Sequence, residues 1–97
     1  MIEITNKFSV KCKKCGTENE IDINDFGVAE INSEERNMGY ETEYYWNCVF
    51  DCFKCSNSLE VIPRAFEYPI GVLNYEDVEC HGCKIIIKPE FSIVNEE

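Results

Sequence analysis

The sequence has few of the residues on which acid–base catalysis and nucleic-acid binding depend. It contains one histidine, His81, so a Ser-His-Asp or Cys-His arrangement would have a single candidate base. Nine lysines and arginines stand against nineteen acidic residues, and the formal net charge of −10 repels the phosphate backbone of nucleic acids. The same charge favours basic partner surfaces, although solubility alone would also account for it.

Long apolar segments are missing as well. The longest run, residues 85–87, is far shorter than the roughly 18 residues of a membrane span, so we expect no membrane association. The first residues lack the apolar region of a secretion signal, which favours a cytoplasmic location. A composition rich in Asn, Ile, Lys, Glu and Tyr is typical of AT-rich coding and favours a bacterial or phage source.

Helical periodicity is almost absent, and short segments that alternate apolar and polar residues dominate the chain. The longest predicted strand covers residues 41–51, and its even positions form one apolar face: Tyr44, Trp46, Cys48 and Phe50. Residues 59–62 predict a strand that Pro63 weakens. At 97 residues the chain has a limited core, so we expect one small β-rich domain over residues 1–97, with little helix and a cross-link to stabilise it.

Residues 24–42 allow two structures. Asn32 and Ser33, followed by Glu34 and Glu35, are typical of a helix N-cap and an acidic first turn, but Gly39 would end that helix within two turns. A long hairpin with residues 28–31 opposite 40–44 is the alternative. Either structure predicts a protruding acidic arm.

The seven cysteines indicate that the expected cross-link is a metal site. In a reducing compartment, closely spaced cysteines are expected to bind metal rather than to form disulfides. The Cys-x-x-Cys motif occurs at residues 12–15, 52–55 and 80–83, each time between apolar segments. A tight turn of this kind places two thiolates on one side, and two such turns supply the four sulfurs of a tetrahedral Zn²⁺ site. Gly16, and Ser56 with Asn57, supply residues that allow the chain to turn back after the first two pairs.

In these two knuckles and their flanking strands the chain resembles the zinc-ribbon group over roughly residues 8–62. The resemblance implies zinc-ribbon-like antiparallel sheets joined by a four-cysteine Zn²⁺ site with the ligands Cys12, Cys15, Cys52 and Cys55. The chain departs from the pattern in the 36 residues between the two pairs, where the acidic arm would be an insertion. The knuckles indicate metal binding and say almost nothing about function.

The third pair, Cys80 and Cys83, leaves alternatives open. It could replace one knuckle as a ligand pair, or hold a second metal with Cys48 and a fourth ligand such as His81, which lies poorly for that purpose within the turn. We expect Cys48 instead to be a small buried hydrophobe among aromatic residues. Dithiol redox chemistry is disfavoured because a strand pattern, rather than a helix that would lower the thiol pKa, follows Cys83.

The sequence predicts no enzyme. A site with four cysteine ligands is closed to water, and the carboxylates of Glu76, Asp77 and Glu79 have no partner lysine or second acidic group, so we expect them to form a solvated edge.

We therefore expect an inhibitor, immunity-like protein or adaptor that binds a basic protein surface, including that of a nucleic-acid-binding protein. Aromatic residues crowd positions 40–53 and either pack in the core or remain outside as contacts. The expected partner-binding residues are Glu34, Glu35, Tyr40, Glu41, Glu43 and Tyr45. The alternative is a zinc-ribbon nucleic-acid-binding or transcription accessory module that uses the lysines of residues 7–14.

Overall fold

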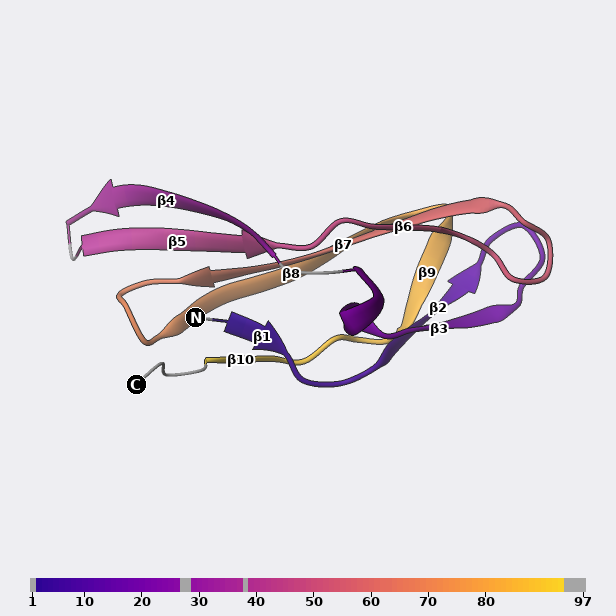
Figure 1. Cartoon of the computed structure of the whole chain (residues 1–97), viewed down its shortest axis with the longest axis horizontal. Helices are drawn as coiled ribbons and strands as arrows, with labels where there is room; N and C mark the ends of the chain where they lie inside the picture. The colour runs from indigo at the N-terminus through magenta and orange to yellow at the C-terminus, as the bar shows by residue number, and fades with distance from the viewer. Residues whose placement is uncertain (1, 27–28, 38, 94–97) are drawn as a thin grey trace.

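The computed structural model describes residues 2–26, 29–37 and 39–93. They form two layers of antiparallel sheet in an elongated molecule of 47 × 24 × 19 Å (Figure 1). The only helix among the described residues is η1 (Ile23–Phe26), a single 3-10 turn. The predicted fold class, β-rich with little helix and with a four-cysteine cluster, is confirmed.

The first layer is a five-stranded sheet built around β7. One side of β7 pairs with β5 and then β6, its other side pairs with β8, and β4 extends the sheet beyond β5. Alternate residues of β7 are buried, because one face of this sheet covers the second layer. The strands are β4 (Glu30–Arg36), β5 (Gly39–Tyr45), β6 (Cys48–Asp51), β7 (Ser58–Glu67) and β8 (Leu73–His81).

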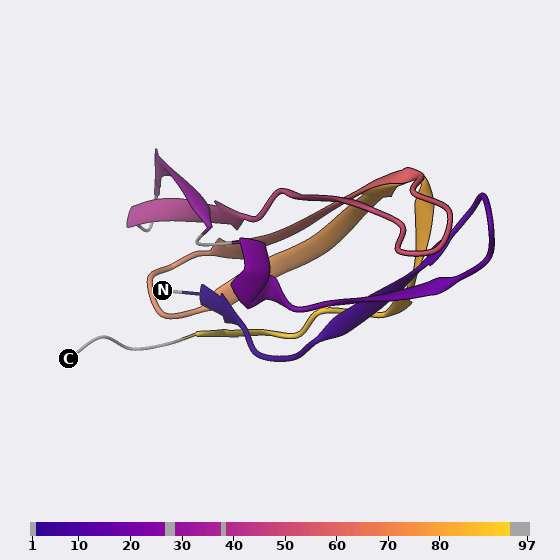
Figure 2. The same cartoon turned by 45° about the vertical axis from the view of Figure 1, so that its right-hand side comes forward.

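The second layer lies beneath this sheet (Figures 1 and 2). It consists of a three-stranded sheet in the order β3-β2-β9 and of the pair β1-β10. The strands are β1 (Ile2–Ile4), β2 (Phe8–Cys12), β3 (Glu18–Ile21), β9 (Cys83–Ile87) and β10 (Phe91–Ile93). The core fills the space between the layers with apolar side chains from both, among them Phe8, Val10, Leu59 and Val61.

The predicted strand over residues 41–51 is interrupted. Its apolar face is as expected, but β5 ends at Tyr45 and β6 begins at Cys48. Pro63 explains the break, because it lies within β7 and accepts a hydrogen bond from the backbone N–H of Trp46 at 3.0 Å. In an antiparallel sheet the N–H and C=O groups of one residue point to the same neighbouring strand. Pro63 has no N–H, so it accepts a hydrogen bond at the gap between β5 and β6 but cannot donate one there. The proline therefore interrupts the neighbouring edge and leaves β7 continuous.

The acidic arm is a hairpin, and the helix considered for residues 32–38 does not form. Strands β4 and β5 pair from Glu30 opposite Tyr45 to Arg36 opposite Gly39, so residues 40–44 face 31–35 and not the 28–31 of the expected hairpin, of which Val28 lies outside the described residues. All of β4 is exposed, so a short isolated helix here would bury nothing to stabilise it. The strand form joins the arm to the sheet, since β5 pairs with β7.

Glu67 holds this arm to the body of the sheet. Its carboxylate accepts a hydrogen bond from the hydroxyl of Tyr44 at 3.0 Å and another from the backbone N–H of Gly71 at 2.7 Å. Burial opposes ionisation of Glu67, but the two hydrogen bonds favour the carboxylate and hold its pKa below the usual value. A charged group thus stabilises the base of the hairpin.

Candidate metal centre

The first knuckle is the turn between β2 and β3. The backbone N–H of Cys12 donates to the carbonyl of Thr17 at 2.9 Å, and the N–H of Gly16 donates back to the carbonyl of Cys12 at 2.8 Å. Gly16 has φ of 75°, in the left-handed region that glycine adopts at no steric cost. These bonds close the turn and leave both of its sulfurs on one side.

The second knuckle, between β6 and β7, repeats this pattern. The N–H of Cys52 donates to the carbonyl of Asn57 and the N–H of Ser56 donates to the carbonyl of Cys52, each at 2.8 Å. Ser56 occupies the place of Gly16 and has φ of 61°, so the serine and not the asparagine adopts the left-handed conformation. Figures 1 and 2 show the two turns together at one end of the molecule.

The four sulfurs of the knuckles form one cluster. The Sγ atoms of Cys12 and Cys55 lie 3.7 Å apart, those of Cys15 and Cys52 lie 3.6 Å apart, and all four fall within 4.8 Å of one another. A disulfide would need about 2.05 Å between sulfurs. A Zn–S distance of about 2.3 Å places the sulfurs of a tetrahedral site about 3.8 Å apart. The cluster thus has the dimensions of a four-thiolate metal site.

Hydrogen bonds favour the thiolate form of two of these sulfurs. The backbone N–H of Cys55 and the side-chain amide of Asn19 lower the pKa of Cys52 to about 6, although burial opposes them. The hydroxyl and the backbone N–H of Thr17 lower the pKa of Cys15 in the same way. Stabilised thiolates are the form in which cysteine binds metal.

Cys55, by contrast, favours its protonated form. The backbone N–H of Asn57 favours the thiolate of Cys55, but burial and the three neighbouring sulfurs outweigh this bond and raise the pKa of Cys55 to about 11. A divalent cation would favour the thiolate of Cys55 as well, because it is a stronger local charge than any of its ligands.

Asn19 connects the two knuckles and was not singled out in the sequence. Its amide nitrogen donates to the carbonyl of Thr17 at 3.2 Å and to Sγ of Cys52 at 3.5 Å, and its Oδ1 accepts from the backbone N–H of Phe53 at 3.1 Å. The residue lies on β3 and is only 4% exposed. A polar residue at an inward position of a strand close to a knuckle was the available signal.

The third cysteine pair lies outside the cluster. Cys80 and Cys83 lie on either side of the corner at which β8 turns into β9; Sγ of Cys80 donates to the carbonyl of Cys83 at 3.2 Å. Burial and the neighbouring Cys80 raise the pKa of Cys83 to about 11. His81 points to carboxylates instead, with Nε2 3.3 Å from Glu79. Within the described residues the knuckle cluster is the only group of three or more potential metal ligands.

Cys48 is fully buried in the core, as expected for a small hydrophobe, and burial raises its pKa to about 11.

The six expected partner-binding residues divide between the two faces of the hairpin. Residues opposite one another in an antiparallel pair share a face. One face of the hairpin carries Glu34, Glu41, Glu43 and Tyr45, and the other carries Glu35 and Tyr40. Arg36 lies on the first face, 3.2 Å from Glu34 and 3.4 Å from Glu41.

The first of these faces continues across the whole sheet. Tyr45 is opposite Arg64 of β7, and Glu43 is opposite Phe66, which is in turn opposite Tyr75 of β8. The ring centroids of Phe66 and Tyr75 lie 5.8 Å apart, and Tyr75 is 56% exposed. The sequence did not indicate these two aromatic residues, because their position beside the arm depends on the pairing of β5 with β7. The outer sheet face comprises Glu34, Glu41, Glu43, Tyr45, Arg64, Phe66, Tyr75 and Asp77.

Comparison of the chain with protein-family models, with curated proteins and with solved structures gave no match. The described part of the chain contains no helix long and apolar enough to cross a membrane.

Proposed function

We propose that this chain is a zinc-stabilised, non-enzymatic binding module that docks its outer sheet face on a basic surface of another protein. The observation that carries this proposal is the composition of that face. Aromatic side chains of Tyr45, Phe66 and Tyr75 lie on it beside the carboxylates of Glu41 and Glu43. Protein interfaces combine aromatic anchors with a polar rim in this way.

Charge supports a basic partner. Residues 30–45 contain five glutamates and one arginine, a net charge of −4 within a chain of −10. Such a field accelerates association with a positive surface and falls with ionic strength. If the partner normally binds nucleic acid, this protein would compete for the same basic groove, as an inhibitor or immunity-like protein would.

We assign Zn²⁺ to the four-cysteine cluster as a structural ion. Tetrahedral sulfur sites hold zinc or iron, and the absence of an open ligand position fits a structural role. The ion joins the β2–β3 and β6–β7 turns, so it fixes the two layers at this end of the molecule. Four cysteine ligands leave no position for a catalytic water, which supports a protein without turnover of its own.

The test begins with affinity capture from the host and uses the purified partner in surface plasmon resonance. Replacing Glu34, Glu41 and Glu43 together with Gln should slow association and reduce its salt dependence, because these residues supply the attraction. The matched control replaces three exposed glutamates of the rest of the chain, Glu3, Glu18 and Glu90, which changes net charge equally.

The outcome distinguishes a general effect of net charge from docking through the outer sheet face. Equal effects of both triple variants, or a Tyr45→Ala variant that dissociates like the wild type, would contradict docking through the outer sheet face. Tight, salt-dependent binding of nonspecific duplex DNA in a gel shift would favour the nucleic-acid module instead.

A further inference from the structure

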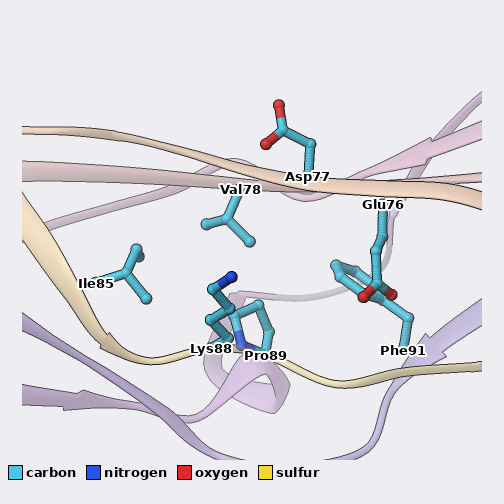
Figure 3. A pocket seen from close by; sticks show the side chains of 7 residues that line it. All are labelled: Glu76, Asp77, Val78, Ile85, Lys88, Pro89 and Phe91. Carbon is cyan, nitrogen blue, oxygen red and sulfur yellow. The ribbon is translucent and has the colours of Figure 1, made fainter.

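The outer edge of β8 is open. Among the described residues β8 pairs only with β7, and residues 74–77 are exposed. An edge strand leaves every second pair of backbone N–H and C=O groups without a partner strand, and these groups can accept another strand. The edge faces the segment that links β9 to β10 (Figure 3).

A cavity of about 180 Å³ lies between this edge and the linking segment. Val78, Ile85 and Pro89 form its apolar wall, the ring of Phe91 closes one end, and Glu76 and Lys88 are the charged side chains that point to it (Figure 3). Phe91 is held in place by Trp46, with 5.9 Å between ring centroids. A cavity of about 150 Å³ with apolar walls accommodates a benzene ring, so this one has room for one branched or aromatic side chain.

The linking segment is anchored by hydrogen bonds. Its polar groups bind the turn between β1 and β2: the backbone N–H of Thr5 donates to the carbonyl of Glu90 at 2.9 Å, and the side chain of Asn6 donates to the carbonyl of Lys88 at 3.2 Å. The backbone N–H of Glu90 also donates to Oδ1 of Asn6 at 2.6 Å. These bonds fix the linking segment in place, so the gap beside β8 is part of the fold.

We propose that the β8 edge binds an extended segment of another protein by strand addition, with one apolar side chain of that segment in the cavity. Side chains of a strand alternate between its faces. Glu76 and Val78 point to the cavity side of β8, whereas Asp77 points to the opposite side (Figure 3). The added strand would therefore direct its apolar residues inward and its alternate residues outward, beside Asp77.

The charge of β8 determines which residues suit the outward positions of the added strand. Strand β8 contains three carboxylates, Glu76, Asp77 and Glu79, and no lysine or arginine. A basic residue at the outward positions complements Asp77; Glu79 on the same side already lies 3.2 Å from Arg64, and Glu76 points to the cavity side (Figure 3). Pairing with β8 of a second copy would bring two acidic edges together, which is unfavourable, so the segment belongs to a different protein. The solvated edge expected from these carboxylates is thus a selective docking strand.

Lys88 is the one cation among the described residues that line the cavity. Its ammonium group rises between Val78 and Pro89 (Figure 3), and the side chain is exposed, so an entering apolar side chain displaces it to solvent. Removal of this charge would favour a basic segment. The inference deepens the proposed protein binding but uses a surface separate from the aromatic residues of the outer sheet face.

The test uses the metal-loaded protein and a synthetic peptide of seven residues in which lysine alternates with valine or leucine. We expect saturable binding in NMR titrations, slower exchange of the outward backbone amides of residues 74–77, and shifts of the methyl groups of Val78 and Ile85. The same peptide N-methylated at alternate residues, on the edge that would face β8, cannot donate these bonds and should bind about tenfold more weakly or worse. Lys88→Ala should bind the lysine peptide more tightly than Lys84→Ala, which removes an equal charge on β9.

Equal affinity of the N-methylated peptide, absence of binding, or shifts confined to the outer sheet face would each overturn strand addition. None of these results depends on the Glu34, Glu41 and Glu43 variants, so docking through the outer sheet face can fail while strand addition holds, and the reverse.

Discussion

Replacement of Asn19 by Ala should destabilise the protein and weaken its hold on metal at the same time. The substitution removes one hydrogen bond to the sulfur of Cys52 and two to backbone groups, those of Thr17 and Phe53. A bond to a charged group contributes about 1.5–3 kcal/mol and a neutral bond about 0.5–1.5 kcal/mol. Because the three bonds share one side chain, we expect a loss of about 2–5 kcal/mol in the free energy of unfolding.

Such a loss is large for a chain of 97 residues. At about 4–8 °C per kcal/mol, the melting temperature should fall by at least about 8 °C. Loss of a group that orients a metal ligand typically weakens metal affinity about 10–100-fold. Thermal unfolding followed by circular dichroism measures the first effect, and competition with a chromophoric chelator measures the second.

Asn32→Ala is the matched control, because Asn32 is an exposed asparagine of β4 far from the knuckles in the sheet order. It should change neither quantity appreciably. A metal affinity of Asn19→Ala within twofold of the wild type would refute the role assigned to Asn19 at the metal, and a melting temperature equal to that of the control would refute the energetic account as well.

Three further predictions concern stability. Glu67→Gln should lower the free energy of unfolding by about 1–3 kcal/mol near neutral pH. Because the native pKa of Glu67 is depressed, its contribution is present above the unfolded pKa and disappears as pH falls through the native value, so the difference between mutant and wild type in urea titrations should narrow as pH is lowered while the metal remains bound. Gly82→Ala should cost more than the about 1–2 kcal/mol expected of Gly16→Ala, since both have positive φ but only at Gly82 would the new Cβ lie 3.0 Å from a backbone oxygen; equal melting temperatures would contradict this. Cys48→Ser should cost about 1–3 kcal/mol as a buried polar replacement, whereas Cys12→Ser should abolish folding, and chemical denaturation separates the two results.

Local chemistry made the knuckles predictable from the sequence. Two cysteines with two residues between them and a turn residue behind them specify a turn almost independently of the rest of the chain. The inward face of residues 44–50 was equally accessible, because period-two alternation is a property of the strand itself.

Features that depend on pairing between distant strands were not predictable. The residues of 24–42 are by themselves compatible with both the helix and the hairpin. The pairing of Thr42 with Glu67 and of Tyr44 with Ala65 favours the hairpin. The break at Trp46 depends in the same way on Pro63, which is 17 positions further along the chain. The role of Asn19 follows from its distance to Cys52, which only the folded chain establishes.

The sequence did not predict that the six expected partner-binding residues lie on two different faces of the hairpin, because this also depends on strand pairing. Charge density along the sequence identified the arm correctly as acidic and protruding, but the register of β4 and β5 determines which side chains share a face. That register separates Tyr40 from Tyr45 and brings Phe66 and Tyr75 into one surface with Tyr45.

The metal content of the purified protein tests the central claim most directly. Protein prepared without chelator and analysed by inductively coupled plasma mass spectrometry should contain one zinc ion per chain and no iron, and the zinc should be lost together with the fold on acidification or prolonged exposure to chelator. A metal-free protein whose circular dichroism spectrum and melting temperature do not change with added chelator would contradict the four-cysteine zinc site, and so would one equivalent of iron in place of zinc.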